Sequence, residues 1–306
     1  MESLSETDVA LYHRPRALGE ALRCLSAHDV TIVAGATDVY PGQVSNQMWS
    51  GSRSQKSWLD ISGIEALQGI AERDDHYRIG ALVTWADLID SSLPPGFDGL
   101  IAAAKGVGGQ QVQNRATLVG NLCNASPAAD AMPPLLSLNA VVEIQSADVS
   151  RLVPVDQFIL GNRSTVLSDK EMVVGIRIPK QFAAGYGAFM KLGARNYLVI
   201  SIVAVAVLIN INEEDEIASV SVAVGSCSAV ALQIPSLEQR LLGTSIHVNL
   251  PELVEPSDFD VLTPIDDVRA SAEYRRDAAC VVTSRLLGEL AHKLSTSRRG
   301  AQGMIG

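Results

Sequence analysis

Apolar and polar positions follow different periods in the two halves of the chain. In the first half, short apolar runs typical of strands alternate with stretches of helical period. The stretch "RPRALGEALRCLSAH" places Leu18, Leu22 and Leu25 on one helical face, and Val30 to Val33 form a strand. Strands are also predicted at 57–62, 140–146 and 172–180. Helices are predicted after Thr84, a suitable N-cap, and from Asp98 to the glycines that begin at 106.

After about Gly185 the apolar runs lengthen and become rich in β-branched residues. Three strands joined by short turns are predicted, with an antiparallel arrangement and the acidic segment 212–216 at a hairpin tip. The longest run, Leu198 to Ile211, is too short to span a bilayer. Ser271 to Lys293 forms an amphipathic helix, whose inward positions are Ala278, Val281, Val282, Leu286 and Leu290. The pattern predicts an α+β architecture with a seam near residue 180.

Length and charge narrow the possible partners. The 306 residues fit two or three sub-domains, and the net charge of −10 argues against binding to nucleic acid or to an anionic membrane. The same charge is also what simple solubility requires. We expect no membrane span and no secretory signal, because the first residues have neither a basic nor an apolar region.

The four cysteines are scattered at positions 24, 123, 227 and 280, without a CxxC pair. Such spacing predicts no metal site and no iron–sulfur cluster bound by this chain alone. Free cysteines favour a reducing compartment, and we therefore expect the protein in the cytoplasm.

Two segments contain residues that bring the backbone close to a ligand. The first, "VAGATD", runs from Val33 to Asp38 after a strand, and the second, "TLVGNLCNASPAAD", runs from Thr117 to Asp130. As loops they could hold a diphosphate through backbone N–H groups and a few side chains, with little need for cations. We expect Gly35 and Gly120 to allow close backbone approach, with positive φ as one possible reason. The alternative is that both segments are ordinary turns.

Other nucleotide-binding motifs are absent from the sequence. Neither segment is a GxGxxG turn in a βαβ unit, and GxxxxGK[ST] does not occur, so no Rossmann or P-loop site is predicted. Lys191 lies within an apolar strand region, where an unpaired ammonium group would be costly. It either extends to solvent or neutralises an electron-rich ring or a phosphate.

Five ordered motifs together resemble the FAD-binding subunits of molybdenum hydroxylases, the family of xanthine dehydrogenase and carbon monoxide dehydrogenase. They are "IVAGATDV", "IGALVTWADL", "ATLVGNLCNASPAAD", "KLGARNYLVISIVAVAV" and "ASAEYRRDAACVVTSRLL". The resemblance implies two α/β sub-domains, at 1–60 and 61–180, that form an FAD-binding unit of the vanillyl-alcohol-oxidase-like type. It also implies a C-terminal domain with an antiparallel sheet and a helix at 181–295, and we expect a flexible tail at 296–306.

The resemblance further implies that FAD is the cofactor of this chain and that its two loops hold it. The flavin carries the chemistry, so no catalytic residue is expected, and Lys191 matches a neighbour of the flavin ring. The implied FAD-binding positions are Val33, Ala34, Gly35, Ala36, Thr37, Asp38, Val39, Val112, Ala116, Thr117, Gly120, Asn121, Ser126, Asp130, Val174 and Lys191, with Val173 as the alternative to Val174.

The chain departs from the family pattern at three positions. Ala36 replaces the second glycine of the first loop, and Val119 replaces the first of two glycines before Asn121. Both changes stiffen the backbone, and we expect FAD binding to persist with slightly altered geometry. Val199 stands where relatives often carry an acidic residue, which leaves open the electron acceptor, whether NAD, oxygen, a quinone or a cytochrome.

By resemblance, the chain passes electrons from the [2Fe-2S] clusters of one partner subunit through FAD to an external acceptor. A molybdenum subunit with molybdopterin would oxidise the substrate, with a purine or another N-heterocycle as the expected class. The complex would be a heterotrimer or a dimer of heterotrimers. We expect an apolar docking patch around Leu122, Met132 and Pro133. The alternatives are a free-standing FAD-dependent dehydrogenase or oxidase and a non-catalytic nucleotide-binding protein.

Overall fold

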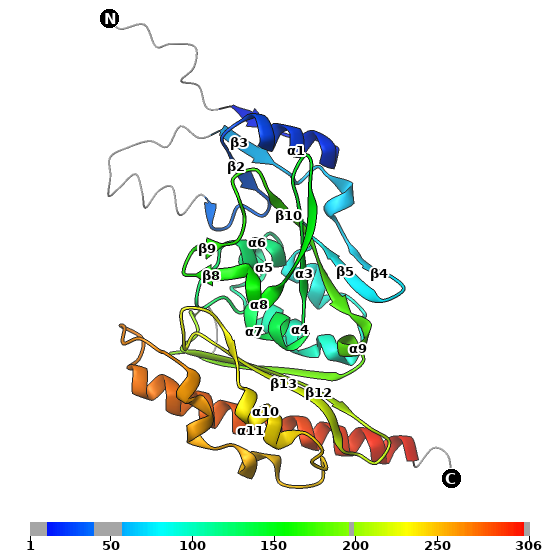
Figure 1. Cartoon of the computed structure of the whole chain (residues 1–306), viewed down its shortest axis with the longest axis vertical. Helices are drawn as coiled ribbons and strands as arrows, with labels where there is room; N and C mark the ends of the chain where they lie inside the picture. The colour runs from blue at the N-terminus through cyan, green and yellow to red at the C-terminus, as the bar shows by residue number, and fades with distance from the viewer. Residues whose placement is uncertain (1–10, 40–56, 196–198, 303–306) are drawn as a thin grey trace, which may run out of the picture.

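The computed structural model describes residues 11–39, 57–195 and 199–302. Figure 1 shows three layers along the long axis: a small sheet near the N-terminus, a larger sheet with helices in the middle, and a sheet with a long helix at the other end. One hydrophobic core joins the first two layers, and a second core lies within the third. The predicted α+β class, with an FAD-type unit followed by a sheet-and-helix domain, is confirmed.

The N-terminal layer is a three-stranded parallel sheet with β3 (Ser57–Asp60) in the centre, between β1 (Tyr12–His13) and β2 (Val30–Val33). Helix α1 (Leu18–Ala27) connects β1 to β2 and buries Ala21, Leu22 and Leu25. The apolar face that the sequence predicts for this helix therefore packs as expected. Because β2 lies at the sheet edge and ends at Val33, the segment 34–39 leaves this sheet toward the middle layer.

The middle layer contains a five-stranded antiparallel sheet in the order β4 (Ile70–Glu72), β5 (His76–Gly80), β10 (Met172–Pro179), β6 (Val141–Gln145) and β7 (Ser150–Pro154). A short hairpin is formed by β8 (Ile159–Gly161) and β9 (Ser164–Thr165). The helices of this layer are α3 (Trp85–Ile89), α4 (Asp98–Gly106), α5 (Gln110–Gln113), α6 (Leu118–Cys123), α7 (Met132–Ser137), α8 (Val155–Phe158) and α9 (Lys180–Ala183). Three-residue 3₁₀ turns lie at Glu65–Leu67 and Pro95–Phe97.

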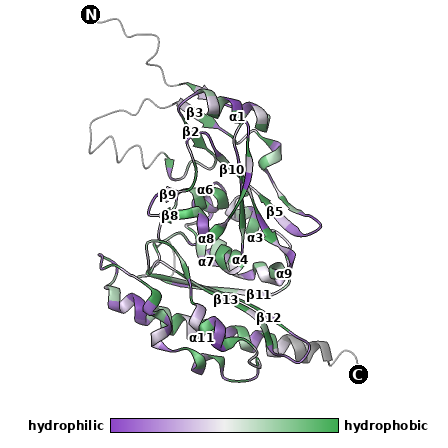
Figure 2. Cartoon of the chain, in the orientation of Figure 1, coloured by the Kyte–Doolittle hydropathy of each residue, from purple (hydrophilic) through white to green (hydrophobic). Residues whose placement is uncertain are grey.

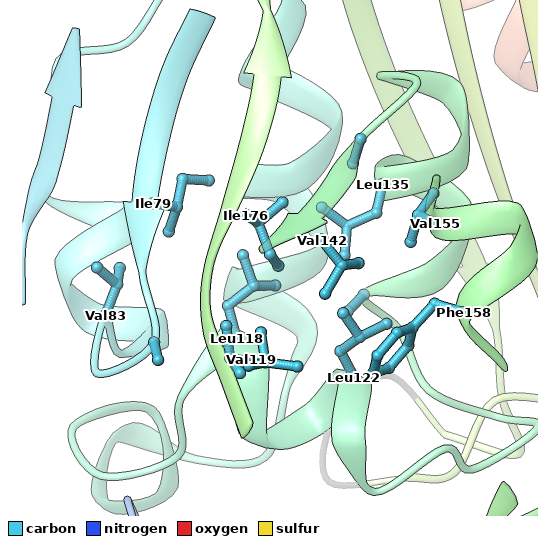
Figure 3. Close-up of a cluster of buried hydrophobic side chains, with 14 of the residues drawn as sticks. Ile79, Val83, Leu118, Val119, Leu122, Leu135, Val142, Val155, Phe158 and Ile176 are labelled. Carbon is cyan, nitrogen blue, oxygen red and sulfur yellow. The ribbon is translucent and has the colours of Figure 1, made fainter. Parts of the chain in front are cut away.

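Helices cover one face of the five-stranded sheet. Figure 3 shows Ile79, Ile176 and Val142 from three strands pointing toward Leu118, Leu122 and Phe158 on α6 and α8. Thr84 caps α3 as predicted, in a capping box with Asp87. Figure 2, which colours each residue by hydropathy, shows that the end of β5 that lies away from this core is hydrophilic.

The C-terminal layer is an antiparallel sheet in the order β11 (Tyr186–Leu192), β12 (Val203–Ile211), β13 (Ile217–Gly225) and β14 (Leu232–Gln233). The three predicted strands and the turn at 212–216 are confirmed, although β12 begins only at Val203 and Leu198 lies outside the described residues. Helix α10 (Pro235–Leu241) and 3₁₀ segments at Leu250–Leu253 and Pro256–Val261 lead to α11 (Ala272–Gln302).

Two expectations about α11 are wrong. Val281 is 56% exposed, because it lies on the opposite side of the helix from the buried stripe of Ala278, Val282, Leu286 and Leu290. The tail expected from residue 296 is helical as far as Gln302, while residues 303–306 lie outside the described part of the chain. Leu294 prolongs the apolar stripe, and no proline interrupts the segment that follows it, so the helix continues.

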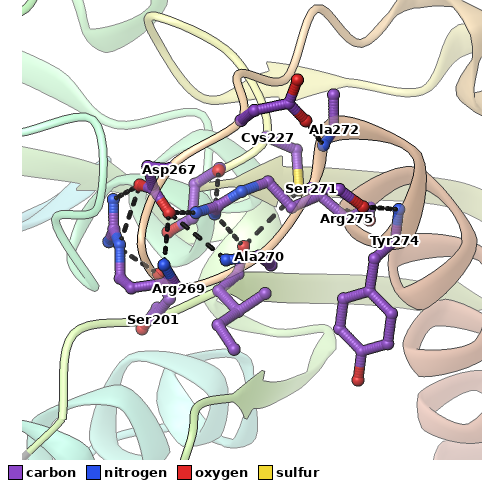
Figure 4. Close-up of polar contacts among 12 residues, drawn as sticks. Ser201, Cys227, Asp267, Arg269, Ala270, Ser271, Ala272, Tyr274 and Arg275 are labelled. Carbon is purple, nitrogen blue, oxygen red and sulfur yellow. Dashed lines mark hydrogen bonds and ion pairs between the residues drawn. The ribbon is translucent and has the colours of Figure 1, made fainter.

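The start of α11 is held by a polar cluster formed by Arg275, Asp267, Arg269 and Ser201, shown in Figure 4. Arg275 is 1% exposed and donates to the carbonyl oxygens of Ile202 and Ser226 and to Asp267. This cluster connects the helix to the end of β13 and to the chain before β12.

Helix α7 packs the middle layer against the C-terminal sheet. Pro133 lies so close to Gly225 of β13 that a Cβ on this glycine would be 2.8 Å from Pro133 Cγ. Met132 and Pro133 are buried, and Leu122 lies in the middle core. The prediction of an apolar docking patch at these residues is therefore wrong, because the chain itself covers them. No helix in the described ranges is long and apolar enough to cross a membrane.

Candidate functional site

A cavity of about 430 Å³ lies where the segment after β2 meets α5, α6 and the start of β10. Both segments singled out in the sequence contribute to its wall. The predicted positions that line it are Ala34, Gly35, Ala36, Thr37, Asp38, Val39, Val112, Ala116, Thr117, Gly120 and Asn121. No Lys or Arg of the described residues lines this cavity, so any anionic group within it would depend on N–H groups and neutral side chains.

The second segment is a helix at the point where the sequence predicts a loop. Thr117 caps α6 by accepting a hydrogen bond from the Gly120 N–H at 2.9 Å, and Leu118 N–H donates to Val83. Leu118 and Leu122 are buried at helical spacing, which favours the helix over an open turn despite the glycine and the asparagines. Asn121 is therefore held on a short helix whose apolar side is anchored in the core.

Gly35 is required by a crossing of two chain segments. A Cβ at this position would lie 2.0 Å from the carbonyl oxygen of Arg115, so the first segment passes directly over the backbone before Ala116. Among the described glycines, neither Gly35 nor Gly120 has positive φ. The left-handed position is Ala36, with φ of 64°, which is the position where the family pattern has glycine.

Several polar groups at the cavity have no partner within the described chain. Oδ1 of Asn121 and Nε1 of Trp85 are buried without a hydrogen bond, and both residues line the cavity. The N–H groups of Gly35, Ala36 and Thr37 donate to none of the described residues. Because buried polar groups are costly when unpaired, this arrangement suits a ligand that offers both donors and acceptors.

Five predicted positions do not line the cavity: Val33, Ser126, Asp130, Val174 and Lys191. Val33 is buried in β2. Ser126 accepts a hydrogen bond from the Ala128 N–H at 3.3 Å. Val173 lines the cavity in place of Val174, because the strand register shifts between Val173 and Gly175 and Val174 faces the core.

Lys191 and Asp130 bind one another. Lys191 Nζ lies 2.7 Å from Asp130 Oδ2 and donates to the Gly106 carbonyl oxygen at 2.7 Å, while Ser201 Oγ donates to the other carboxylate oxygen at 2.6 Å. Lys191 therefore does not extend freely to solvent as one alternative predicted. It joins the C-terminal end of α4 to the C-terminal sheet, next to Val107 at the cavity wall.

The sequence missed the apolar part of the wall, some of which comes from a connection outside the quoted motifs. Leu167 and Met172 reach the cavity from the connection between β9 and β10. Arg151 fixes this connection through two hydrogen bonds to Glu171 and one to the Val166 carbonyl. The hydrogen bonds from Arg151 lower the pKa of Glu171 to about 2. The other missed residues are Ile32, Ile61, Ala81, Trp85, Val107, Val119, Cys123 and Asn124.

Cys123 is the one thiol in the described cavity wall. Burial raises its pKa to about 12, so the group is a neutral thiol and not a nucleophilic thiolate. The described wall thus offers apolar surface, unpaired hydrogen-bonding groups and the carboxylate of Asp38, but no activated nucleophile.

Comparisons with known proteins agree with this geometry. The family "FAD binding domain in molybdopterin dehydrogenase" matches residues 5–181, and "CO dehydrogenase flavoprotein C-terminal domain" matches residues 188–290. The chain is 28% identical to a xanthine dehydrogenase FAD-binding subunit of Escherichia coli O157:H7, over 92% of this chain and 96% of that one. It is also 28% identical to the nicotine 6-hydroxylase medium subunit of Paenarthrobacter nicotinovorans, over 86% and 91% of the two chains.

A solved structure of carbon monoxide dehydrogenase from Hydrogenophaga pseudoflava is similar in fold. Its matching chain superposes with a TM-score of 0.81 at 26% identity, covering 93% of this chain and 98% of that chain. The similarity thus extends over all three layers and is not limited to the segments around the cavity.

Proposed function

Because the chain belongs to the family of FAD-binding subunits of molybdenum hydroxylases, a family of oxidoreductases, we propose that FAD occupies the cavity between the segment 34–39 and helix α6. The observation that carries this assignment is the buried, unpartnered Oδ1 of Asn121 in the cavity wall. It supports the assignment because an acceptor left without a partner in the described protein can bind a donor of the cofactor.

Different residues around the cavity bind different parts of the cofactor. The N–H groups of Gly35, Ala36 and Thr37, which donate to none of the described residues, bind the diphosphate, whose charge they stabilise without a lysine. Thr37 and Asn121 supply side-chain hydrogen bonds to the polar chain of the cofactor. Met172 and Leu167 form an apolar wall that excludes water from the ring.

FAD bound there supplies the redox chemistry, since it can take up electrons from [2Fe-2S] clusters of one partner and deliver them to an external acceptor. The protein residues need only bind, orient and desolvate the cofactor. None of the described wall residues is an activated acid, base or nucleophile, in agreement with a subunit whose substrate is oxidised elsewhere.

In this proposal Lys191 and Asp130 influence the FAD site indirectly, by holding structural elements next to the cavity in place. Their ion pair and the bond from Lys191 to the Gly106 carbonyl fix the end of α4 against β11. Val107, the next residue after Gly106, lines the cavity. The pair therefore positions one edge of the flavin site relative to the C-terminal sheet, and it does not need to touch the cofactor.

We infer that the complete enzyme also contains an iron–sulfur subunit and a molybdenum subunit, as a heterotrimer or a dimer of heterotrimers. An N-heterocyclic substrate, such as a purine, is supported by relatives that are named for xanthine and nicotine. A cytoplasmic location is supported by the four free cysteines. The domain limits 1–60, 61–180 and 181–295 are part of the same proposal.

The proposal is tested with the isolated chain and its two partner subunits. Alone, the chain should bind FAD but should not reduce it when xanthine or another N-heterocycle is added. Addition of both partners should produce substrate-dependent bleaching of the flavin absorbance, and omission of either partner should abolish it. Substrate-dependent reduction by the metal-free isolated chain would contradict the subunit assignment and support a free-standing flavoenzyme.

A further inference from the structure

A cluster of nitrogen and sulfur ligands lies in the N-terminal layer, outside the cavity wall. His13 belongs to β1, Cys24 lies in the last turn of α1, and His28 follows that helix as its C-cap. One ligand atom from each residue lies within 4.8 Å of the others. The scattered cysteines predicted no metal site, but the fold brings His13 against a Cys24–His28 pair that is four residues apart.

We propose that His13, Cys24 and His28 form a binding site for a borderline-soft divalent cation, with Zn²⁺ as the best fit and water in the fourth position. Two imidazoles and one thiolate are ligands that Zn²⁺ prefers. With bonds of about 2.0–2.3 Å, tetrahedral ligand atoms lie roughly 3.5 Å apart. Sγ of Cys24 lies 3.9 Å from Nδ1 of His28, which also lies 3.2 Å from the Cys24 carbonyl oxygen, so the His28 ring would exchange this contact for the cation and the side chains would rotate to close the spacing.

Ring stacking on His28 does not account for the unpaired Nε2 of His13, which indicates a ligand. The rings of His13 and His28 have centroids 5.0 Å apart and are tilted by 34°. Stacking would explain their proximity, but it would leave Nε2 of His13 buried and without a partner among the described residues, as it is here. Coordination of a cation would satisfy this nitrogen, whereas a second imidazole face would not.

The remaining features of the cluster fit a cation that enters from solvent. His28 is exposed, so one side of the site is open to water. Binding forms a metal–sulfur bond at Cys24, and the thiol proton passes to water with no change of oxidation state.

Occupancy of this site would stabilise the layer that contributes Ile32, Ile61 and the segment 34–39 to the cavity wall. The cation would link β1 to the end of α1, and β2 begins at Val30, two residues after His28. The end of β2 leads directly into the segment 34–39. We therefore assign the cation a structural role, which does not depend on whether FAD occupies the cavity.

Cobalt absorbance provides a direct test with the full chain. The protein is freed of metal with a chelator and titrated with Co²⁺, whose thiolate complexes give a charge-transfer band. We expect one equivalent of Co²⁺ to produce the band, and Zn²⁺ to displace it. Cys24→Ser should abolish the band, and His13→Ala should weaken Co²⁺ binding at least tenfold.

Cys280→Ser is the matched control, since Cys280 is a partly buried thiol in α11, in the other core. It should keep the band unchanged. His28→Gln tests the same site if His13→Ala disturbs β1, and circular dichroism shows whether each variant is folded. Absence of the band in the folded wild-type chain, or its persistence in Cys24→Ser, would overturn the assignment.

Discussion

The cavity proposed to hold FAD and the Arg275 cluster both contain polar groups in the interior, but most of those groups in the cluster, apart from Arg275 Nε, are paired within the protein, whereas several at the cavity are not. At the cluster, Arg275 donates to two carbonyl oxygens and to Asp267, which also accepts from Arg269 (Figure 4). At the cavity, Asn121 Oδ1 and Trp85 Nε1 have no partner in the described chain. The cluster therefore stabilises the fold, whereas the cavity keeps its hydrogen-bonding capacity for a ligand.

Charge pairing, and not backbone conformation, separates the two regions. Positive φ, which costs a non-glycine residue about 1 kcal/mol or more, occurs in both, at Ala36 in the cavity wall and at Ser226 in the cluster. Charge pairs are concentrated in the cluster, where the hydrogen bonds from Arg269, together with Arg275, hold the pKa of Asp267 well below its usual range. Mutations in the two regions should accordingly affect different properties, stability in one and cofactor affinity in the other.

The largest effect is expected at Arg275. Arg275→Met removes one of the two charge partners of Asp267 and the guanidinium donor to the carbonyl oxygens of Ile202 and Ser226, so the free energy of unfolding should fall by about 3–5 kcal/mol. Urea unfolding followed by circular dichroism measures this loss. Arg285→Met, at an exposed position of the same helix, should change stability by no more than about 0.5 kcal/mol. A similarly small change for Arg275→Met would contradict the stabilising role of the cluster.

Asn121→Leu should weaken FAD binding and leave the stability of the protein nearly unchanged. Loss of its hydrogen bonds to the cofactor should cost about 1.5–3 kcal/mol of FAD binding, or roughly 10- to 150-fold in Kd. The stability of the protein without FAD should hardly change, because Oδ1 has no partner to lose in the described protein. Fluorescence titration with FAD measures the affinity, with exposed Asn249→Leu as the control. Unchanged affinity would remove Asn121 from the site.

Acid should weaken the cavity wall through Glu171. Its pKa is about 2 in the folded protein, below the ordinary value near 4.5, so its ionised form stabilises the fold above pH 4.5. That contribution, about 1 kcal/mol, should disappear as the pH falls from 4.5 toward 2. Glu171→Gln should be less stable at pH 6 and should show a flatter pH dependence of unfolding in this range. Equal slopes for both proteins would exclude Glu171 as the titrating group.

The smallest effect is expected at Ala36. Ala36→Gly relieves the left-handed strain but increases the entropy of the unfolded chain, so we expect a net gain in stability of at most about 1 kcal/mol. Ala102→Gly, in the exposed face of α4, should instead destabilise by about 1 kcal/mol. Differential scanning calorimetry compares the two variants, and a loss in both would show that Ala36 is not strained.

Local patterns predicted much of the fold and part of the site. The capping box at Thr84, strand β10 and its end at Pro179, and the hairpin at 212–216 follow from nearby residues alone. The position of the first segment directly after strand β2 could also be predicted from nearby residues, and most of this segment lines the cavity.

The failures have a common cause in long-range packing. Helix α6 forms because Leu118 and Leu122 find a core that their neighbours in sequence do not reveal. Lys191 meets Asp130 across the two cores, and Pro133 is covered by β13, so neither contact could be inferred from one segment. The strand shift that places Val173 at the cavity instead of Val174 depends on pairing with β6.

Hydrogen exchange with and without FAD tests most directly the claim that the cavity binds the cofactor and the Arg275 cluster does not. FAD should slow amide exchange in residues 34–39, 112–124 and 167–173, while residues around Ile202, Ser226 and Arg275 should exchange at unchanged rates. Protection confined to the C-terminal layer, or no protection at saturating FAD, would contradict the assignment of the site.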